Sequence, residues 1–439
     1  MALQDATQPQ LDFARRPAQV RALIAEAVPS LFPGHTLSAL EQQYTRYKAG
    51  KEHVGLYRVE LDPPVDGAAP VLTVIFGQRK RLIRGYERLP NNGEGHSALL
   101  LREGSCLIEV FPADFELPSL WDAADRSRAS ALLRRLHVDG NASTVTRIEV
   151  LRYRPERRCV LRYELEREDG SRTELVGKLY DDAGRARGVA DKLAALAKQQ
   201  TNEIRLPMAI ADPDDASLLL MTLMRGTNLG DQIENNMSRQ ENEAAVRAAA
   251  SALARFHRFR LSTTKRRSLR TELDNLLQRI ERLHAVAPAL AEDIEALLQQ
   301  VSQLLDSLPP AKDCVIHGEY KPNQLLLDDG SVAVVDLDRA CLGDPAIDVG
   351  NFMAVLRKEV VFEGHTHLES LDGVFLATYE EQATRVDGLA ERAHVFEVIS
   401  FLRMLTRYFE RAPQAYERRG SKWPPLALLT EARRSLAAL

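Results

Sequence analysis

One segment of the chain, from Cys314 to Phe352, constrains its fold more than any other part. Its sequence is CVIHGEYKPNQLLLDDGSVAVVDLDRACLGDPAIDVGNF. The apolar runs predict short strands, and the Asp-Asp-Gly-Ser sequence between two of them predicts a β-hairpin turn. Such a hairpin places Gln324 where one strand begins and Asp336 where its partner ends, with Glu319 in the loop just before. Two carboxylates and an amide therefore converge at one hairpin mouth, and oxygen ligands of this kind suit a Mg²⁺ ion that carries phosphates.

This segment resembles the catalytic and metal loops of the aminoglycoside phosphotransferase and choline kinase-like family, which is related to the protein kinases. The family pattern is His-Gly-Asp, four further residues and Asn, then a metal-binding Asp, Gly-Asp-Pro and a last Asp. The matching residues here are His317, Gly318, Glu319, Gln324, Asp336, Gly343, Asp344, Pro345 and Asp348. Gln in place of Asn is also a feature of maltokinase-like members. The resemblance covers residues 140–439 and implies an α+β, protein kinase-like bilobal fold, with a β-rich small lobe and a helical large lobe.

The resemblance implies a role for each residue at the hairpin mouth. Asp336 would bind a Mg²⁺ ion that bridges the β- and γ-phosphates of ATP, and Gln324 would add a neutral ligand. Asp338 lies two residues further on the same strand face and is a third candidate ligand. Glu319 occupies the position of the catalytic Asp, which accepts the proton of the acceptor hydroxyl.

Nucleotide contacts are expected on the N-terminal side of this segment. Lys178, in the strand LVGKLY, matches the family lysine that contacts the α- and β-phosphates. No glycine-rich phosphate loop precedes it, and Arg157 and Arg158 in RYRPERRCVLRY could hold the phosphates by charge instead. The hinge between the lobes, whose backbone would pair with adenine, is expected at Met221, Thr222, Leu223 and Met224. Each of these segments also has a structural interpretation, as a strand lysine, a solvated basic turn, or a buried strand and turn.

Other polar residues of the resemblance are expected to support the fold. His317 would hold the loop by hydrogen bonds and His257 would pack inside the large lobe. Asp344 and Asp348 would cap and anchor the helix that follows. The helix carboxylate that should pair with Lys178 has two candidates, Asp191 and Glu203.

Glu319 departs from the family pattern, because its carboxylate stands one methylene further from the backbone than that of Asp. A misplacement of ~1 Å can lower a rate by ~100-fold. Two functions therefore stay open. The first is an ATP- and Mg²⁺-dependent phosphotransferase that acts on a hydroxyl of a small molecule, with a sugar or aminosugar preferred. The second is a nucleotide-binding pseudokinase, weak or inactive in catalysis, that regulates or scaffolds a partner.

The chain is expected to have three parts: an N-terminal α/β extension over 1–137, the small lobe over 138–224, and the helical lobe over 225–439. RYKAGKEHVGLYRVE from Arg46 aligns without gaps with RYRPERRCVLRYELE from Arg152. The extension is therefore either a degenerate copy of the small-lobe hairpin or a chance likeness of alternating strands. In the first copy, Ile75 or Phe76 stands where the second has Lys178. The extension could also hold a protein partner.

Local patterns in the extension also predict helices. Apolar spacing predicts a helix over 18–32 that Pro29 and Pro33 stop, and a single helix from Ser119 to Leu136. A proline-containing loop is expected at 423–425.

Composition excludes several other classes of protein. The 439 residues include 58 Lys and Arg against 62 Asp and Glu, for a net charge of −4, which is not that of a general nucleic-acid or anionic-membrane binder. No apolar run reaches the ~20 residues of a membrane span, and the N-terminus lacks a signal-peptide core. We therefore expect a soluble cytoplasmic protein. Its cysteines, Cys106, Cys159, Cys314 and Cys341, form no CxxC pair and are expected to be free thiols.

Overall fold

The computed structural model describes residues 11, 14, 16–48, 50–90, 97–138, 143–211, 216–235, 238–284, 287–309, 311–383, 387–411, 419 and 424–439. The chain divides into two compact units. The first comprises Met1–Ala190, Ala209–Thr222 and Phe409–Gly420. The second comprises Asp191–Met208, Leu223–Tyr408 and Ser421–Leu439. Within the described residues, every helix is too short or too polar to cross a bilayer.

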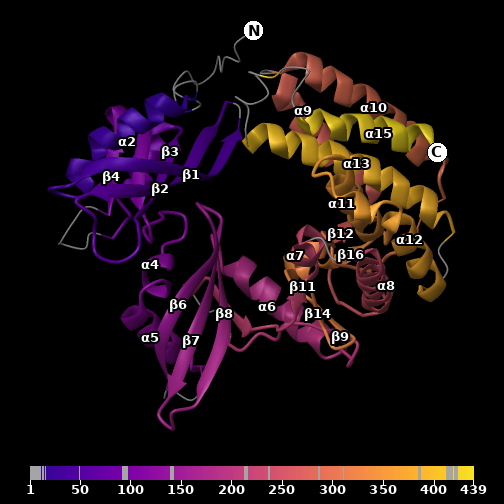
Figure 1. Cartoon of the computed structure of the whole chain (residues 1–439), viewed down its shortest axis with the longest axis horizontal. Coiled ribbons are helices and arrows are strands. Elements are labelled where there is room, and N and C mark those ends of the chain that lie inside the picture. Colours follow the sequence, from indigo (N-terminus) through magenta and orange to yellow (C-terminus); the bar gives the residue numbers. More distant parts are fainter. Residues whose placement is uncertain are drawn as a thin grey trace. The chain divides into compact units, whose positions relative to one another are not determined.

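The first unit contains an antiparallel sheet with the strand order β1-β2-β3-β5-β4. Its strands are β1 (Thr36–Lys48), β2 (Glu52–Asp62), β3 (Val71–Phe76), β4 (Ala98–Leu101) and β5 (Cys106–Val110). Helix α2 (Pro17–Leu31) covers one face, where Ile24 shares a core with Leu72 and Phe76 (Figure 1). Helix α3 (Arg79–Tyr86) covers the other, where Leu82 shares a core with Ile75. Successive side chains of β3 therefore point to opposite faces of the sheet and contribute to two cores.

The second sheet of this unit has the order β10-β8-β7-β6. Its strands are β6 (Ser143–Arg154), β7 (Arg158–Arg167), β8 (Arg172–Tyr180) and β10 (Leu218–Thr222), and α6 (Ala183–Ala197) follows β8. Helices α4 (Leu120–Ala123) and α5 (Arg126–Arg135) pack on it, because Leu120, Ala129 and Leu133 share a core with Leu161 and Tyr163. The core of the second sheet thus takes side chains from before residue 137, where the extension was expected to end.

The two sheets pair their first three strands in corresponding registers. Arg46 pairs with Val54 in the first sheet, and Arg152 pairs with Val160 in the second, at the aligned positions. Val54 then pairs with Ile75, as Val160 pairs with Lys178. Ile75 is therefore the counterpart of Lys178, one of the two residues expected there. The matching registers favour the interpretation that the three-stranded unit is duplicated.

A buried ionic network joins the turn between β6 and β7 to the first sheet. Arg46 donates to the carbonyl of Pro155 at 3.1 Å and to the carboxylate of Glu156 at 2.6 Å. Arg81 donates to the other oxygen of Glu156 at 2.6 Å, and Asp114 accepts the backbone N–H of Glu156 at 2.8 Å. The exposed fraction of the Glu156 side chain is only 2%. The turn between β6 and β7 is thus held in place by buried ion pairs and hydrogen bonds.

The second unit is mainly helical. Its helices are α7 (Leu229–Glu234), α8 (Arg239–Phe256), α9 (Leu269–His284), α10 (Pro288–Ser307), α11 (Ala346–Val361), α12 (Leu371–Gln382), α13 (Leu389–Arg411, whose last residues belong to the first unit) and α15 (Ala427–Ala437). One sheet has the order β11-β14-β15-β9, with β9 (Ile204–Arg205), β11 (Thr227–Asn228), β14 (Leu325–Asp328) and β15 (Ser331–Val334). The other has the order β12-β16-β13, with β12 (Arg266–Arg267), β13 (Cys314–Ile316) and β16 (Cys341–Gly343). Strands β13 to β16 of these two sheets all lie in the segment from Cys314 to Phe352.

The structure corrects two local predictions. Pro29 does not stop helix α2, which continues to Leu31, because the proline ring fixes φ near the helical value and its missing N–H costs one hydrogen bond in the last turn. The predicted helix over 119–136 is two helices, because Asp125 is extended and its side chain caps α5 through the N–H of Arg128. The four cysteines are free, as expected. Of the expected loop at 423–425, residue 423 lies outside the described residues.

The ionic network yields a stability prediction. Arg46→Met should destabilise the protein by about 3–5 kcal/mol, because it leaves Glu156 and its neighbour Glu52 buried with less positive charge. Thermal and urea unfolding measure the loss. Arg58→Met, on the exposed side of β2, is the matched control and should change stability little. Equal stabilities of the two variants would contradict a structural role for the network.

Candidate active site

The hairpin mouth forms as the sequence predicts. Strands β14 and β15 are joined by a tight turn in which Asp329 and Gly330 both have positive φ, at 41° and 80°. The backbone N–H of Val335 donates to the carbonyl of Gln324 at 3.0 Å. The side-chain Nε2 of Gln324 donates to the carboxylate of Asp336 at 3.3 Å. The two predicted ligands therefore lie in contact.

The donor set at this mouth fits a hard cation. Gln324 is 5% exposed, and its Oε1 has no hydrogen-bond partner among the described residues. A buried oxygen without a partner is costly unless a ligand or water satisfies it. Together with the Asp336 carboxylate it offers neutral and anionic oxygens, the ligands that Mg²⁺ prefers. The described residues hold no group of three or more His, Cys, Asp or Glu side chains that could bind a metal by themselves, so phosphate and water oxygens would complete the coordination.

Asp338 does not share a strand face with Asp336, which corrects that premise. Strand β15 ends at Val334, and Asp336 has a left-handed backbone with φ 66°. Leu337–Arg339 then form a 3₁₀ turn. The carbonyl of Asp338 accepts a hydrogen bond from Nζ of Lys192 at 2.6 Å. Strand alternation therefore gives no support for Asp338 as a third ligand.

The loop before the hairpin is held by one buried carboxylate. Asp348, on α11, accepts the backbone N–H groups of His317 at 2.6 Å, Gly318 at 2.8 Å and Tyr320 at 3.4 Å. It was expected to anchor its own helix, but its oxygens face the loop instead. Asp344 does begin the helix, since it accepts the N–H of Ala346 at 3.0 Å.

Two aromatic side chains orient this carboxylate. A ring nitrogen of His257 lies 3.2 Å from Asp348, and the other lies 2.7 Å from the hydroxyl of Tyr379. Burial alone would raise the pKa of Asp348, but the hydrogen bond and charge of His257 lower it below its ordinary value. His317 supports the loop as expected, with its Nε2 3.0 Å from the carbonyl of Val335. His257 is thus a hydrogen-bonded support as well as a packing residue.

Glu319 lies among cations that the sequence analysis did not single out. Nζ of Lys321 is 3.1 Å from its carboxylate, Nε of Arg339 is 3.5 Å and Nη1 of Arg407 is 3.7 Å. Burial alone would raise the pKa of Glu319, but these cations, with Arg403, hold it well below its ordinary range. Lys321 and Arg339 are close in sequence and could have been noticed. Arg403 and Arg407 come from α13, and only the tertiary fold brings them here.

Lys178 lies in the first unit on the inner strand β8, between β7 and β10. It is 5% exposed, and its Nζ lies 5.5 Å from the ring centroid of Tyr180. Of its two candidate partners, Glu203 is engaged elsewhere, because both of its oxygens lie 2.8 Å from Arg255. Asp191 lies on the exposed side of α6.

The remaining nucleotide candidates lie on the segments that were expected to carry them. Arg157 is exposed in the turn before β7, and Arg158, the first residue of β7, is half-buried. Met221 and Thr222 end β10, and the chain leaves the first unit between Thr222 and Leu223, with Met224 following. This crossing point is where the hinge was predicted.

Comparison with solved structures finds kinase-like relatives. A choline kinase from Cryptosporidium parvum is 12% identical, with a TM-score of 0.51 over 72% of this chain and 96% of that one. A macrolide 2′-phosphotransferase from Brachybacterium faecium is 22% identical, with a TM-score of 0.45 over 68% of this chain and 97% of that one. The first likeness supports the protein kinase-like α+β fold. No curated protein matches the chain.

Comparison with family models places the sequence. Residues 160–393 match the model of the phosphotransferase enzyme family, APH, which is more than half of the chain. The match includes the strand of Lys178, the loop of Glu319 and the hairpin of Gln324 and Asp336. The chain therefore belongs to the phosphotransferase enzyme family, as its catalytic-loop pattern predicted.

Proposed function

We propose that the protein is an ATP- and Mg²⁺-dependent phosphotransferase that transfers the γ-phosphate to a hydroxyl of a small molecule. The single observation that carries the proposal is the mouth of the β14–β15 hairpin. There the unpartnered Oε1 of Gln324 and the carboxylate of Asp336 offer two oxygen ligands for a cation beside the loop of Glu319. Family membership supports the same reaction class.

The roles of the residues follow from their chemistry. Gln324 and Asp336 would hold Mg²⁺, which, when bound, supplies positive charge to the phosphate oxygens. Lys178 and the arginines at 157 and 158 would bind phosphate oxygens, and residues 221–224 would contact adenine. Asp338 remains a further candidate ligand. Glu319 would orient the acceptor hydroxyl and take its proton. The bond from the γ-phosphorus to the bridging oxygen breaks, a bond to the acceptor oxygen forms, and ADP leaves.

A sugar-like hydroxyl is the acceptor that we propose, and the aminosugars of the original expectation fit the site less well. The side chains around Glu319 are positively charged, and they determine which charge on the acceptor is favourable. A protonated amine beside Glu319 would have to compete with Lys321 and Arg339 for the same carboxylate.

A second candidate, a nucleotide-binding pseudokinase, is favoured by one observation. The cations around Glu319 lower its pKa well below its ordinary range, and a carboxylate with a low pKa is a weak general base. In that case nucleotide binding would be retained and turnover would be absent. The buried network around Glu156 would then link the nucleotide-facing turn to the first sheet for a regulatory purpose.

Replacement of the proposed base tests the first candidate against the second. Glu319→Gln should lower turnover by about 100-fold or more while the thermal stabilisation by Mg·ATP stays unchanged, because the amide keeps the shape but takes no proton. Glu319→Asp, the usual family residue, is the matched control and should retain turnover. ADP release from Mg·ATP with sugar acceptors measures both. Turnover that Glu319→Gln leaves unchanged would remove the base role.

Replacement of the cation ligand gives a separate prediction. Asp336→Asn should abolish the Mg²⁺-dependent part of the thermal stabilisation by ATP, because the site loses its anionic oxygen. A ligand at 100 times its Kd adds ~2.7 kcal/mol to the stability, so the shift is measurable. Asp329→Asn, at the exposed turn of the same hairpin, removes the same charge and should leave the shift intact. A full Mg²⁺-dependent shift in Asp336→Asn would contradict the assignment.

The charge around Glu319 predicts the pH dependence of turnover. A lowered pKa keeps the carboxylate ionised at acidic pH, so kcat should not fall as the pH decreases through the ordinary range of a glutamate. Lys321→Met removes the nearest cation, raises the pKa of Glu319 and should move the acid limb to higher pH. Profiles of kcat at saturating substrates measure this. Identical acid limbs in both proteins would show that Glu319 does not control the rate.

A further inference from the structure

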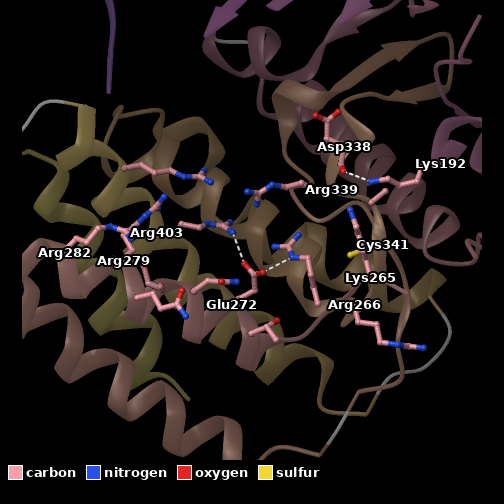
Figure 2. Close-up of a pocket in the computed structure, with 17 residues that line it drawn as sticks. Lys192, Lys265, Arg266, Glu272, Arg279, Arg282, Asp338, Arg339, Cys341 and Arg403 are labelled. Atoms are coloured by element: carbon pink, nitrogen blue, oxygen red, sulfur yellow. Dashed lines mark hydrogen bonds and ion pairs between the residues drawn. The ribbon is translucent and has the colours of Figure 1, made fainter. Parts of the chain in front are cut away.

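A strongly basic cavity of about 700 Å³ lies in the second unit beside the catalytic loop (Figure 2). Its walls come from α9, α13, β12 and the Asp338–Cys341 segment. Among the described residues that line it, nine are Lys or Arg and two are acidic, Glu272 and Asp338. The volume lies within the range that small-molecule sites occupy.

The positive charge of this cavity is only partly neutralised from within. Glu272 pairs with Arg267 at 2.8 Å and with Arg403 at 3.5 Å, and Figure 2 shows Glu272 directed toward Arg403. Nη2 of Arg267 and Nε of Arg403 are buried and have no hydrogen-bond partner among the described residues. Burial and the neighbouring Arg407 lower the pKa of Arg403 to about 9. A bound anion would satisfy the buried N–H donors and reduce the repulsion between the guanidinium groups.

The cavity is connected to Glu319 through shared residues. Arg339 and Arg407 line the cavity and also face the Glu319 carboxylate, at 3.5 Å and 3.7 Å. Arg267 lines it and donates from Nη1 to the carbonyl of Gly318 at 2.6 Å. Gly318 has φ 79°, and a Cβ there would collide with this guanidinium. A molecule in the cavity would therefore lie against the loop that carries the proposed base.

We propose that this cavity binds an anionic group of the acceptor, so that the acceptor is a phosphorylated or carboxylated sugar-like alcohol. The inference rests on the proposed phosphotransferase function and narrows its substrate class. The anion would be held by guanidinium groups of α9 and α13, with the reacting hydroxyl directed toward Glu319. Guanidinium groups suit this role because their paired N–H donors match phosphate and carboxylate oxygens.

The same charges argue against the cationic acceptors of the original expectation. A free aminosugar would bring positive charge next to Arg339, Arg403 and Arg407, which disfavours binding. The shape argues against an extended polymer, because the basic groups line a concave cavity whose volume matches a small molecule. We therefore exclude aminosugars from the proposed substrate class.

Binding of matched probes tests the inference. Glucose, glucosamine, glucose 6-phosphate and glucuronate share one sugar ring and differ mainly in the charge of a single substituent, and calorimetry of the full chain without nucleotide gives their affinities. We expect the two anionic sugars to bind at least tenfold more tightly than glucose or glucosamine, and to weaken as NaCl is raised from 50 to 300 mM. The phosphate and carboxylate arms show which anion the site prefers. Thermal shift with Mg·ATP is measured in parallel.

Substitutions in the cavity wall distinguish binding of the anion in this cavity from its non-specific attraction to positive charge elsewhere on the protein. Arg279 and Arg282 line the cavity on α9, and neither is among the residues assigned to catalysis. Arg279→Gln combined with Arg282→Gln should weaken the anionic probe by tenfold or more and leave the Mg·ATP shift unchanged. Arg270→Gln is the matched control, since Arg270 lies on the same helix but pairs with Ser302 and Asp306 on α10.

The outcomes distinguish this inference from the proposed function. A Mg·ATP shift with no preference for anionic over neutral or amino probes would overturn the inference and leave the function standing. Anion binding that the double variant does not weaken, or that ATP abolishes by direct competition, would also overturn it. Tight anion binding without any nucleotide shift or ADP release would instead remove the proposed phosphotransferase.

Discussion

The carboxylate of Asp348 is the group on which the geometry of the candidate site depends. It lies inside α11, without exposure to solvent, and accepts backbone N–H groups from the loop of Glu319. A buried carboxylate is costly unless its oxygens are satisfied, and here the loop amides and His257 satisfy them. The loop therefore cannot move away without leaving a charge unpaired. This requirement fixes where Glu319 stands relative to the β14–β15 hairpin.

A second consequence follows from the arginines that surround this rigid loop. The cations near Glu319 favour its ionised form, so they orient the carboxylate and at the same time weaken it as a base. The same guanidinium groups face the cavity, where they can attract an anion. One cluster of charge therefore connects acid–base strength with acceptor choice. A phosphotransferase that accepts cations would need the opposite sign at this position.

The same strand pattern occurs twice in the first unit, with different residues at the equivalent positions of β3 and β8. In the second sheet the pattern carries Lys178, and in the first sheet the corresponding Ile75 faces a core. The turn of the second hairpin has no glycine-rich sequence, and Glu156 there is instead clamped by Arg46 and Arg81. Backbone flexibility at this turn is thus replaced by buried ion pairs. The extension is in this sense part of the structure that supports the second sheet.

Much of the candidate site was predictable from local sequence. The hairpin mouth, with Gln324 beside Asp336, follows from turn chemistry and strand alternation, which act over few residues. The catalytic-loop pattern also identified the family, because its ordered polar residues are specific. Local patterns failed where the chain leaves regular strand or helix geometry within a few residues. Asp338 left the strand face because the chain turns into a 3₁₀ segment, and the helix over 119–136 broke at a capping residue.

Only the tertiary structure decided which distant side chains meet at the loop. Asp348 was expected to anchor its own helix, but the fold of α11 against the loop directs its oxygens to His317 and Gly318. Arg403 and Arg407 follow Glu319 by more than eighty residues, and no local pattern relates them to it. Hydrogen bonds within a hairpin are fixed by spacing along the chain, so the sequence alone determined that Gln324 and Asp336 meet at the hairpin mouth. Charge around a carboxylate depends on packing between helices, so the cluster of cations around Glu319 and the basic cavity beside it were decided by the fold.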